Sequence, residues 1–412
     1  MSRKPLGLFG GFGIELEYMI VRGRDCSVFP VSDRVLSRFN GSLSSEIRRG
    51  ALDWSNELVL HVIELKTHGP APRLESLPSL FQTDVSAINA FLEPQGGRLL
   101  PTAMHPWMDP SRETRLWPHE YNEVYEAYNR IFGCSGHGWA NLQSMHLNLP
   151  FADDREFGRL HAAIRLILPL LPALAASSPV VEGRPTGLLD SRIEFYRKNQ
   201  ARVPSLTGSV IPEPVHTEAD YRREILARLY RDIAPLDEAR CLQHEWLNSR
   251  GAIARFERHA IEIRLIDVQE CPLADLTVAA AVVGALRLLD SAEVTGPDPR
   301  RFFPTDALSD LLTRTIRDGE YAPVPDRSYQ KALGLRPDAS ATAGAIWRRL
   351  AERMSGDLLD PVWHAPLKTI LDRGPLARRM LRVLNDDFSR SAVMALCNRL
   401  ADCLSEGRLL DA

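Results

Sequence analysis

Polar and apolar residues alternate in several short stretches of the first two thirds of the chain, as they do in β-strands with one buried face. This alternation predicts strands over residues 12–21, 58–67, 141–150 and 260–268. Apolar residues at helical spacing predict helices over residues 74–93, 121–132, 160–176, 217–233 and 273–289, with the third kinked at Pro169 or Pro172. The chain is therefore expected to combine a sheet with helices.

The last part of the chain has a different pattern. Residues 296–304 are rich in Gly, Pro and Asp and are the best candidate for a linker. Beyond them, residues 306–412 predict four or five amphipathic helices without any chemical motif. We expect a first domain over 1–295 that carries the chemistry and a helical extension over 296–412 that packs on it.

Charged and polar side chains interrupt the predicted strands at alternate positions. Because side chains on a strand alternate between faces, Glu15 and Glu17 share a face, while Ile14, Leu16 and Tyr18 lie on the other. A single Glu-x-Glu pair is most often a solvated edge of a sheet. Matching polar residues on the other predicted strands favour a shared site instead, and they are Glu64, His146, Asn148, Glu262 and Arg264.

Composition narrows the classes of function. The chain has 412 residues, of which 44% are hydrophobic and 25% charged, and its formal net charge is −3. This is the composition of a soluble globular protein, and near-neutral charge disfavours binding of nucleic acid through phosphates. The start lacks the apolar core of a signal peptide, and the most apolar run, 162–176, is too short to span a membrane. The six cysteines are scattered, which favours free thiols and a cytoplasmic location.

The residue types on the strands favour hard divalent cations. Several carboxylates with a single histidine suit Mg²⁺, with Mn²⁺ as an alternative ion, whereas zinc sites usually show clustered cysteine or histidine. Arginines at positions 250, 255 and 264 can hold phosphate oxygens with planar pairs of donors. Together these groups suit a nucleoside triphosphate. A phosphate-binding loop of the Gly-x-x-x-x-Gly-Lys-Ser/Thr type is missing, and Gly11-Phe12-Gly13 lacks the third glycine of a dinucleotide fingerprint.

Five motifs in this order resemble glutamate–cysteine ligase family 2, whose members are ATP-dependent carboxylate–amine ligases related to glutamine synthetase. The resemblance covers roughly residues 8–290. The motifs are Gly13-Ile14-Glu15-Leu16-Glu17-Tyr18, Glu64-Leu65-Lys66-Thr67, His146-Leu147-Asn148, Ala175-Ala176-Ser177-Ser178-Pro179 and Ala260-Ile261-Glu262-Ile263-Arg264-Leu265-Ile266-Asp267. The resemblance implies an α+β fold with a curved, mostly antiparallel sheet of the glutamine-synthetase and guanidino-kinase type, backed by helices.

Site residues follow from the same resemblance. It implies metal ligands at Glu15, Glu17, Glu64, His146 and Glu262. It implies nucleotide contacts at Asn148, Arg250, Arg255 and Arg264, with the three arginines also acting on the transferred phosphoryl group. Many family members have a second histidine where this chain has Asn148, which bears on nucleotide contacts and substrate choice. Glu57 is a further candidate, but it is seven residues from Glu64 and shares its face only if a bulge or bend intervenes.

The reaction that the resemblance implies is amide formation through an acyl phosphate, with small-molecule carboxylate and amine substrates. Glutamate and cysteine are the family default, with γ-glutamyl transfer to an amino-acid amine, and a homodimer is compatible with the resemblance. Two other functions remain open: a phosphotransferase of the guanidino-kinase kind, and an ATP-binding scaffold without turnover. Clustered carboxylates weigh against the scaffold, because without a cation they would only destabilise the fold.

Overall fold

The computed structural model describes residues 5–120, 122–291, 300–354 and 358–411, and its centre is an eight-stranded sheet. The strand order is β2-β3-β4-β1-β6-β10-β9, with β5 paired to the far end of β1, and every pairing is antiparallel. The strands are β1 Gly13–Arg22, β2 Glu46–Arg49, β3 Leu52–Asn56, β4 Val62–Thr67, β5 Gly97–Leu100, β6 Ser144–Pro150, β9 Ala252–Arg255 and β10 Ala260–Asp267. The expectation of a mostly antiparallel sheet is confirmed.

The central strand β1 lies between β4 and β6, and its register brings the polar residues of three strands level with one another. Glu17 pairs with Glu64 on β4, and Glu15 pairs with His146 on β6. Gly13 pairs with Asn148, and a Cβ atom at Gly13 would lie 2.8 Å from the Asn148 Cβ, so only glycine leaves room for this side chain. Register thus gathers residues that are far apart in sequence.

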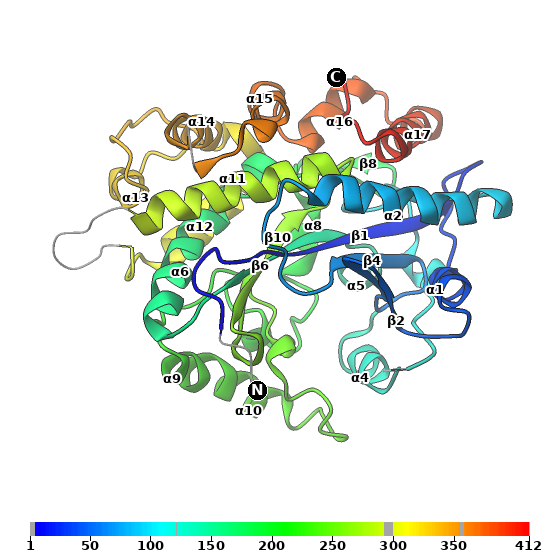
Figure 1. Ribbon diagram of the computed structural model, residues 1–412, viewed down its shortest axis with the longest axis horizontal. Coiled ribbons are helices and arrows are strands. Elements are labelled where there is room, and N and C mark those ends of the chain that lie inside the picture. The colour runs from blue at the N-terminus through cyan, green and yellow to red at the C-terminus, as the bar shows by residue number, and fades with distance from the viewer. Residues whose placement is uncertain (1–4, 121, 292–299, 355–357, 412) are drawn as a thin grey trace.

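One face of the sheet is apolar and packs against helices. Ile14, Leu16 and Tyr18 are fully buried there, together with residues of α2 Leu77–Leu92, α6 Asp154–Ile167 and α11 Pro272–Ser291. Figure 1 shows α2 and α11 running along this face. By length and composition α11 could span a membrane, but 83% of its most apolar window is buried inside the protein, as in the core helix of a globular fold.

Most predicted elements are present. The strand predicted over 58–67 is shorter, because β3 ends at Asn56 and the chain turns before β4 begins at Val62, so that β3 and β4 form a hairpin. Helix α6 ends at Ile167, and Pro169 and Pro172 then form a 3₁₀ turn, Leu168–Leu170, and the short helix α7 Pro172–Ala175, so the kink is confirmed. The helix from Thr217 contains a π segment, Arg222–Leu226, between α9 Glu218–Tyr221 and α10 Ala227–Ile233.

Shorter elements connect these parts. They are α1 Ser32–Asn40, α3 Pro110–Glu113, α4 Asn122–Phe132, α5 His137–Ala140, α8 Ser191–Tyr196 and a small hairpin of β7 Val180–Val181 and β8 Arg184–Pro185. Gly133, with φ of 71°, ends α4 as predicted.

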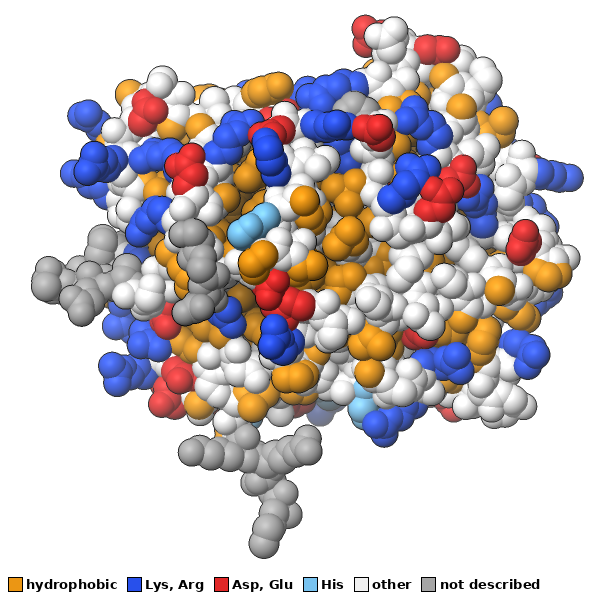
Figure 2. All heavy atoms as spheres, turned by 45° about the horizontal axis from the view of Figure 1, so that its top comes forward, with side chains coloured by type: hydrophobic (Ala, Val, Ile, Leu, Met, Phe, Trp, Pro, Cys, Tyr) orange, Lys and Arg blue, Asp and Glu red, His pale blue; other side chains and the backbone are white. Residues whose placement is uncertain are grey.

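The C-terminal region adds helices to the same core. They are α12 Thr305–Asp318, α13 Arg327–Ala332, α14 Ala343–Arg353, α15 His364–Arg373, α16 Leu376–Leu384 and α17 Arg390–Glu406, one more than the largest number expected. The first part of the predicted linker, 296–299, lies outside the described residues. Buried side chains of α12, α14 and α15 belong to the main hydrophobic core, while α16 and α17 cover Met19 and Val21 of β1. On the face shown in Figure 2, acidic and basic side chains alternate around apolar ones, without a field of one sign.

Candidate active site

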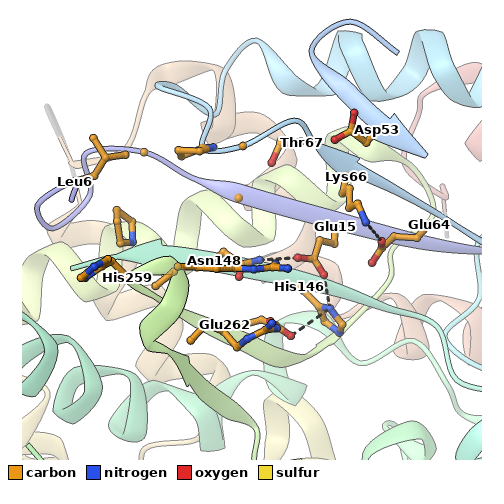
Figure 3. A pocket seen from close by; sticks show the side chains of 18 of the residues that line it. Leu6, Glu15, Asp53, Glu64, Lys66, Thr67, His146, Asn148, His259 and Glu262 are labelled. Carbon is orange, nitrogen blue, oxygen red and sulfur yellow. Dashed lines mark hydrogen bonds and ion pairs between the residues drawn. The ribbon is translucent and has the colours of Figure 1, made fainter. Parts of the chain in front are cut away.

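A cleft of about 900 Å³ lies over the polar face of β1, β4, β6 and β10. Leu6 and His259 lie at one end and Glu64 at the other, with Glu15 and His146 between them (Figure 3). Of the described side chains that line the cleft, seven are carboxylates and four are Lys or Arg. A pocket with this excess of negative charge is suited to cations.

Glu15, His146 and Glu262 form the first candidate group of metal ligands, drawn from β1, β6 and β10. One ligand atom of each lies within 4.8 Å of the others. The Nδ1 atom of His146 is 2.9 Å from Glu15 Oε2 and 3.8 Å from Glu262 Oε1. Glu262 and His146 are buried, with 4% and 7% of their surface exposed. The three strands therefore hold this group rigidly.

Glu17, Glu64 and the same His146 form the second group, again within 4.8 Å of one another. The backbone N–H of Ser144 donates to Glu17 Oε2 at 2.7 Å, which fixes that carboxylate from β6. Lys66 Nζ lies 3.1 Å from Glu64 Oε2. His146 thus stands between two pairs of carboxylates.

Charge and burial perturb the protonation of these groups. Burial, together with the charge of Glu15, raises the pKa of Glu64 to about 7. Burial would lower the pKa of His146, but its hydrogen bond to Glu15 and the charges of Glu15 and Glu17 raise it to about 9. In the protein without a cation, His146 therefore carries the positive charge that the carboxylates require.

These residues fit divalent cations. Each group offers two carboxylates and one imidazole, and oxygen donors are the ligands that Mg²⁺ prefers. A cation would take the place of the proton on His146 and would screen the repulsion that raises the pKa of Glu64. Of the residues predicted as metal ligands, all five lie together in the cleft, although their role as ligands stays a proposal.

Two of the three predicted arginines also line the cleft. Arg264 Nε lies 3.0 Å from Glu262 Oε1, and Arg255 Nη1 donates to Glu262 Oε2 at 3.2 Å. The pairing of β10 with β6 shifts register between Ile263 and Ile266, and the Arg264 N–H donates to Gly251 on the other side. This irregularity sets where the Arg264 side chain enters the cleft.

Arg250 lies elsewhere. It has 1% of its surface exposed and donates from Nε and Nη2 to the two carboxylate oxygens of Glu213, each at 2.6 Å. A third contact runs from Nη1 to the backbone carbonyl of Ser205. Because its donors are bonded to Glu213 and Ser205 in the core, Arg250 is not part of the proposed site.

Glu57 lines the cleft, and the bend that its spacing from Glu64 requires for this is present. Because the chain turns between β3 and β4, the residue that pairs with Glu64 is Ser55, and Glu57 follows on the turn. Burial and the charges of Glu17 and Glu64 raise the pKa of Glu57 well above its usual value. The turn thus adds a further carboxylate to the end of the cleft where Glu64 lies, which we call the acidic end.

Sequence reasoning missed several lining residues: Glu46, Asp53, Lys66, Arg258 and His259. Lys66 could have been found, because it lies two residues after Glu64 and so shares its face. Arg258 and His259 belong to the tight connection between β9 and β10, which no pattern in the sequence predicts. Asn148 lies where expected and donates from Nδ2 to Glu15 Oε1 at 2.9 Å.

Comparisons with known proteins show the family of the chain. The family model of glutamate-cysteine ligase family 2 matches residues 11–385. A protein of Archaeoglobus fulgidus, described as an uncharacterized protein, is 31% identical over 397 residues, which cover 92% of this chain and 94% of that relative.

Solved structures resemble the chain in fold. The glutamate–cysteine ligase of Francisella tularensis, in complex with AMP, superposes with a TM-score of 0.60 at 12% identity and covers 97% of this chain and 90% of its own. A bifunctional glutathione synthetase from Pasteurella multocida gives a TM-score of 0.54 at 13% identity, covering 95% of this chain, which spans about half the length of that enzyme (52%).

Proposed function

Since the chain belongs to glutamate–cysteine ligase family 2, we propose that it is an ATP-dependent carboxylate–amine ligase. One observation carries the proposal: two groups of carboxylates share His146 on the floor of a cleft that two arginines also enter. An ATP-dependent ligase has to hold a highly charged triphosphate beside a carboxylate, and this arrangement provides both cation sites and guanidinium groups.

The proposed reaction has two steps. A carboxylate oxygen of the acid first attacks the γ-phosphorus of ATP, the bond to ADP breaks, and an acyl phosphate forms. The amine then attacks the acyl carbon, inorganic phosphate leaves, and the amine nitrogen loses a proton. The family default for the acid is glutamate reacting through its γ-carboxyl group, with an amino acid as the amine.

The residues of the cleft have three roles in this proposal. Glu15, Glu17, Glu64, His146 and Glu262 hold divalent cations. Mg²⁺, when bound, supplies Lewis-acid stabilisation of the negative charge on phosphoryl oxygens. Arg264 and Arg255, both anchored on Glu262, present further donors to phosphate oxygens. Asn148, whose amide also donates to Glu15, contacts the nucleotide.

The test is release of phosphate from Mg²⁺-ATP across a matrix of acids and amines, with mass detection of products. A ligase requires both an acid and an amine for sustained release, and it yields a product whose mass is their sum less one water. Phosphate transfer to a guanidine compound without any acid, or binding of ATP without turnover under every combination, would reject the proposal in favour of a kinase or a scaffold.

The matched control is Glu262→Gln. This change keeps the size of the side chain but removes the charge that pairs with both Arg255 and Arg264 and lies in the first ligand group. At the Mg²⁺ concentration of the assay, the same preparation of Glu262→Gln should therefore release no phosphate above background. Residual release in that variant would reveal a contaminating ATPase.

A further inference from the structure

A second pocket, of about 450 Å³, has a lining that differs from that of the cleft. We call it the aromatic pocket, and its lining residues are Val124, Tyr125, Tyr128, Cys241, His244 and Trp246. The Trp246 ring centroid is 6.0 Å from that of Tyr128 and 5.6 Å from that of His244, which stacks on it at 14°. Among its described lining residues there is no carboxylate, lysine or arginine, so it suits an apolar, flat group.

The aromatic pocket adjoins the acidic end of the cleft. Asn56, the last residue of β3, donates from Nδ2 to the Tyr125 hydroxyl at 3.0 Å. The next residue, Glu57, lines the cleft itself. Burial and the charges of Glu57 and Glu64 raise the pKa of Tyr125, which agrees with this closeness. Tyr125 therefore lies on the side of the aromatic pocket that is close to Glu57.

The opposite end of the cleft is the better place for the nucleoside. Its described lining residues Leu6, Pro70 and His259 offer apolar and ring surfaces to a base. In phosphoryl transfer the attacking and leaving oxygens lie roughly in line, so the acceptor approaches the γ-phosphorus from the side away from ADP. With the nucleoside near His259, that side is the one toward Glu64 (Figure 3). Glu57 lies near Glu64, whose charge acts on it.

Charge then separates the two substrates. The reacting group of the acid is a carboxylate, and the carboxylates of the cleft repel it until cations are in place, whereas the reacting group of the amine arrives as an ammonium ion. Glu57 forms no ion pair with any residue that the structure describes. Its carboxyl group accepts one hydrogen bond there, from the Leu58 N–H at 3.4 Å, so its oxygens are available to accept hydrogen bonds from an incoming ammonium group.

We propose that the aromatic pocket binds the apolar, aromatic-sized side chain of the amine substrate while Glu57 attracts its ammonium group. This inference rests on the proposed ligase function and narrows it, because it makes an aromatic amino acid a better acceptor than a small one. Cysteine, the default amine of the family, would leave most of a pocket of this size unfilled.

The experiment compares L-phenylalanine with L-alanine as the amine, with glutamate as the acid, and detects the amide by mass. In the wild-type protein kcat/KM should be at least tenfold higher for phenylalanine. Trp246→Ala should reduce this ratio about tenfold, and Trp246→Phe should restore most of it. Trp107→Ala, which changes a tryptophan packed near Arg390 and outside both pockets, should keep the wild-type ratio.

A binding measurement separates failure of the subsite from failure of the function. Calorimetric titration with 2-phenylethylamine and with ethylamine needs no turnover, and only the former should bind, with the binding lost in Trp246→Ala. Amide formation with equal kcat/KM for both amino acids would overturn the aromatic pocket and leave the ligase standing. Selective binding without any amide would retain the pocket and reject the ligase, and absence of both selectivities would overturn the pocket.

Discussion

Two regions of this protein differ in how their buried charges are compensated, because the charges are paired in one and left without enough partners in the other. Glu270 and Arg379 form an ion pair with neither side chain exposed, and the Leu410 N–H also donates to Glu270 at 3.1 Å. In the cleft, by contrast, Glu15, Glu17 and Glu57 are left to share His146. Burial of charge is costly in both regions, but only in the first does the protein itself supply the opposite charge.

The ion pair of Asp267 and Arg192 confirms that the fold can satisfy a buried carboxylate. Asp267 accepts from the Ser177 N–H at 2.7 Å and from the Ser178 hydroxyl at 2.9 Å, and Arg192 donates to its other oxygen. Asp267 is the last residue of the strand that also carries Glu262. A deficit of positive charge a few residues away is therefore a local property of the cleft, and it is a reason to place cations there.

The sharpest way to break this comparison is to neutralise carboxylates of the cleft. Glu15→Gln and Glu17→Gln should each lower ligase activity on the order of 10³-fold, since each removes charge from a candidate cation site. Each protein should stay folded, because glutamine keeps the size of the side chain and the geometry of the strand. Phosphate release and thermal unfolding measure the two effects.

The matched control is Leu16→Gln, which places an amide in the fully buried face of the same strand and should impair folding. Active Glu15→Gln protein with normal Mg²⁺ dependence would show that these carboxylates are only a polar surface.

The second prediction concerns the region where Glu270 and Arg379 are paired, and it removes a positive charge instead of a negative one. Arg379→Met leaves Glu270 buried without its partner and should lower the free energy of unfolding by about 3–5 kcal/mol. Adding Glu270→Gln should recover much of that loss, because the amide can still accept from the Leu410 N–H. Denaturant unfolding measures both variants. If Arg379→Met left the free energy of unfolding unchanged, the ion pair would contribute nothing to stability, and the two regions would not differ in the energy of their buried charges.

Arg264 belongs to the cleft, and its replacement by lysine tests whether it acts on phosphate. Lysine keeps the charge but loses the planar pair of donors, so kcat should fall about 10²-fold, on the order of 3 kcal/mol, with a smaller change in the KM for ATP. Added Mg²⁺ should partly rescue Glu262→Gln but not Arg264→Lys. Full activity of Arg264→Lys would assign the residue to a mere ion pair with Glu262, 3.0 Å away.

The sequence predicts which strand residues face the cleft, because side chains alternate between the two faces of a strand and this alternation depends only on neighbouring residues. Alternation alone placed Glu15 and Glu17 on a face opposite Leu16, and the same rule could have added Lys66. Residues whose position depends on tertiary structure were harder to predict. Glu57 reaches the cleft through a turn inside the predicted strand, and Arg250 is held in the core by Glu213, 37 residues earlier in the chain.

The smallest expected effect is the pH dependence of stability, and it follows from the charges of the cleft that lack partners. Glu64 has a pKa near 7 in the folded protein and an ordinary value of 4.5, so between these values unfolding releases a proton and becomes easier as pH rises. His146 has a folded pKa near 9 against 6.5, so its contribution is complete below pH 6.5 and is lost as pH rises toward 9. Both groups act in the same direction.

Without divalent cations, the free energy of unfolding should therefore fall by roughly 1.4 kcal/mol for each rise of one in pH over most of the range from about pH 5 to pH 9, because unfolding releases about one proton there. Mg²⁺ competes with the same protons, so the rise in Tm on adding Mg²⁺ should be larger at pH 8.5 than at pH 6. Glu64→Gln should remove the part of the slope below pH 7, while Glu270→Gln in the region of paired charges should not alter the Mg²⁺ response. If Mg²⁺ raised Tm equally at both pH values, cation binding would not displace protons from the cleft, and His146 would have to be removed from the proposed ligands.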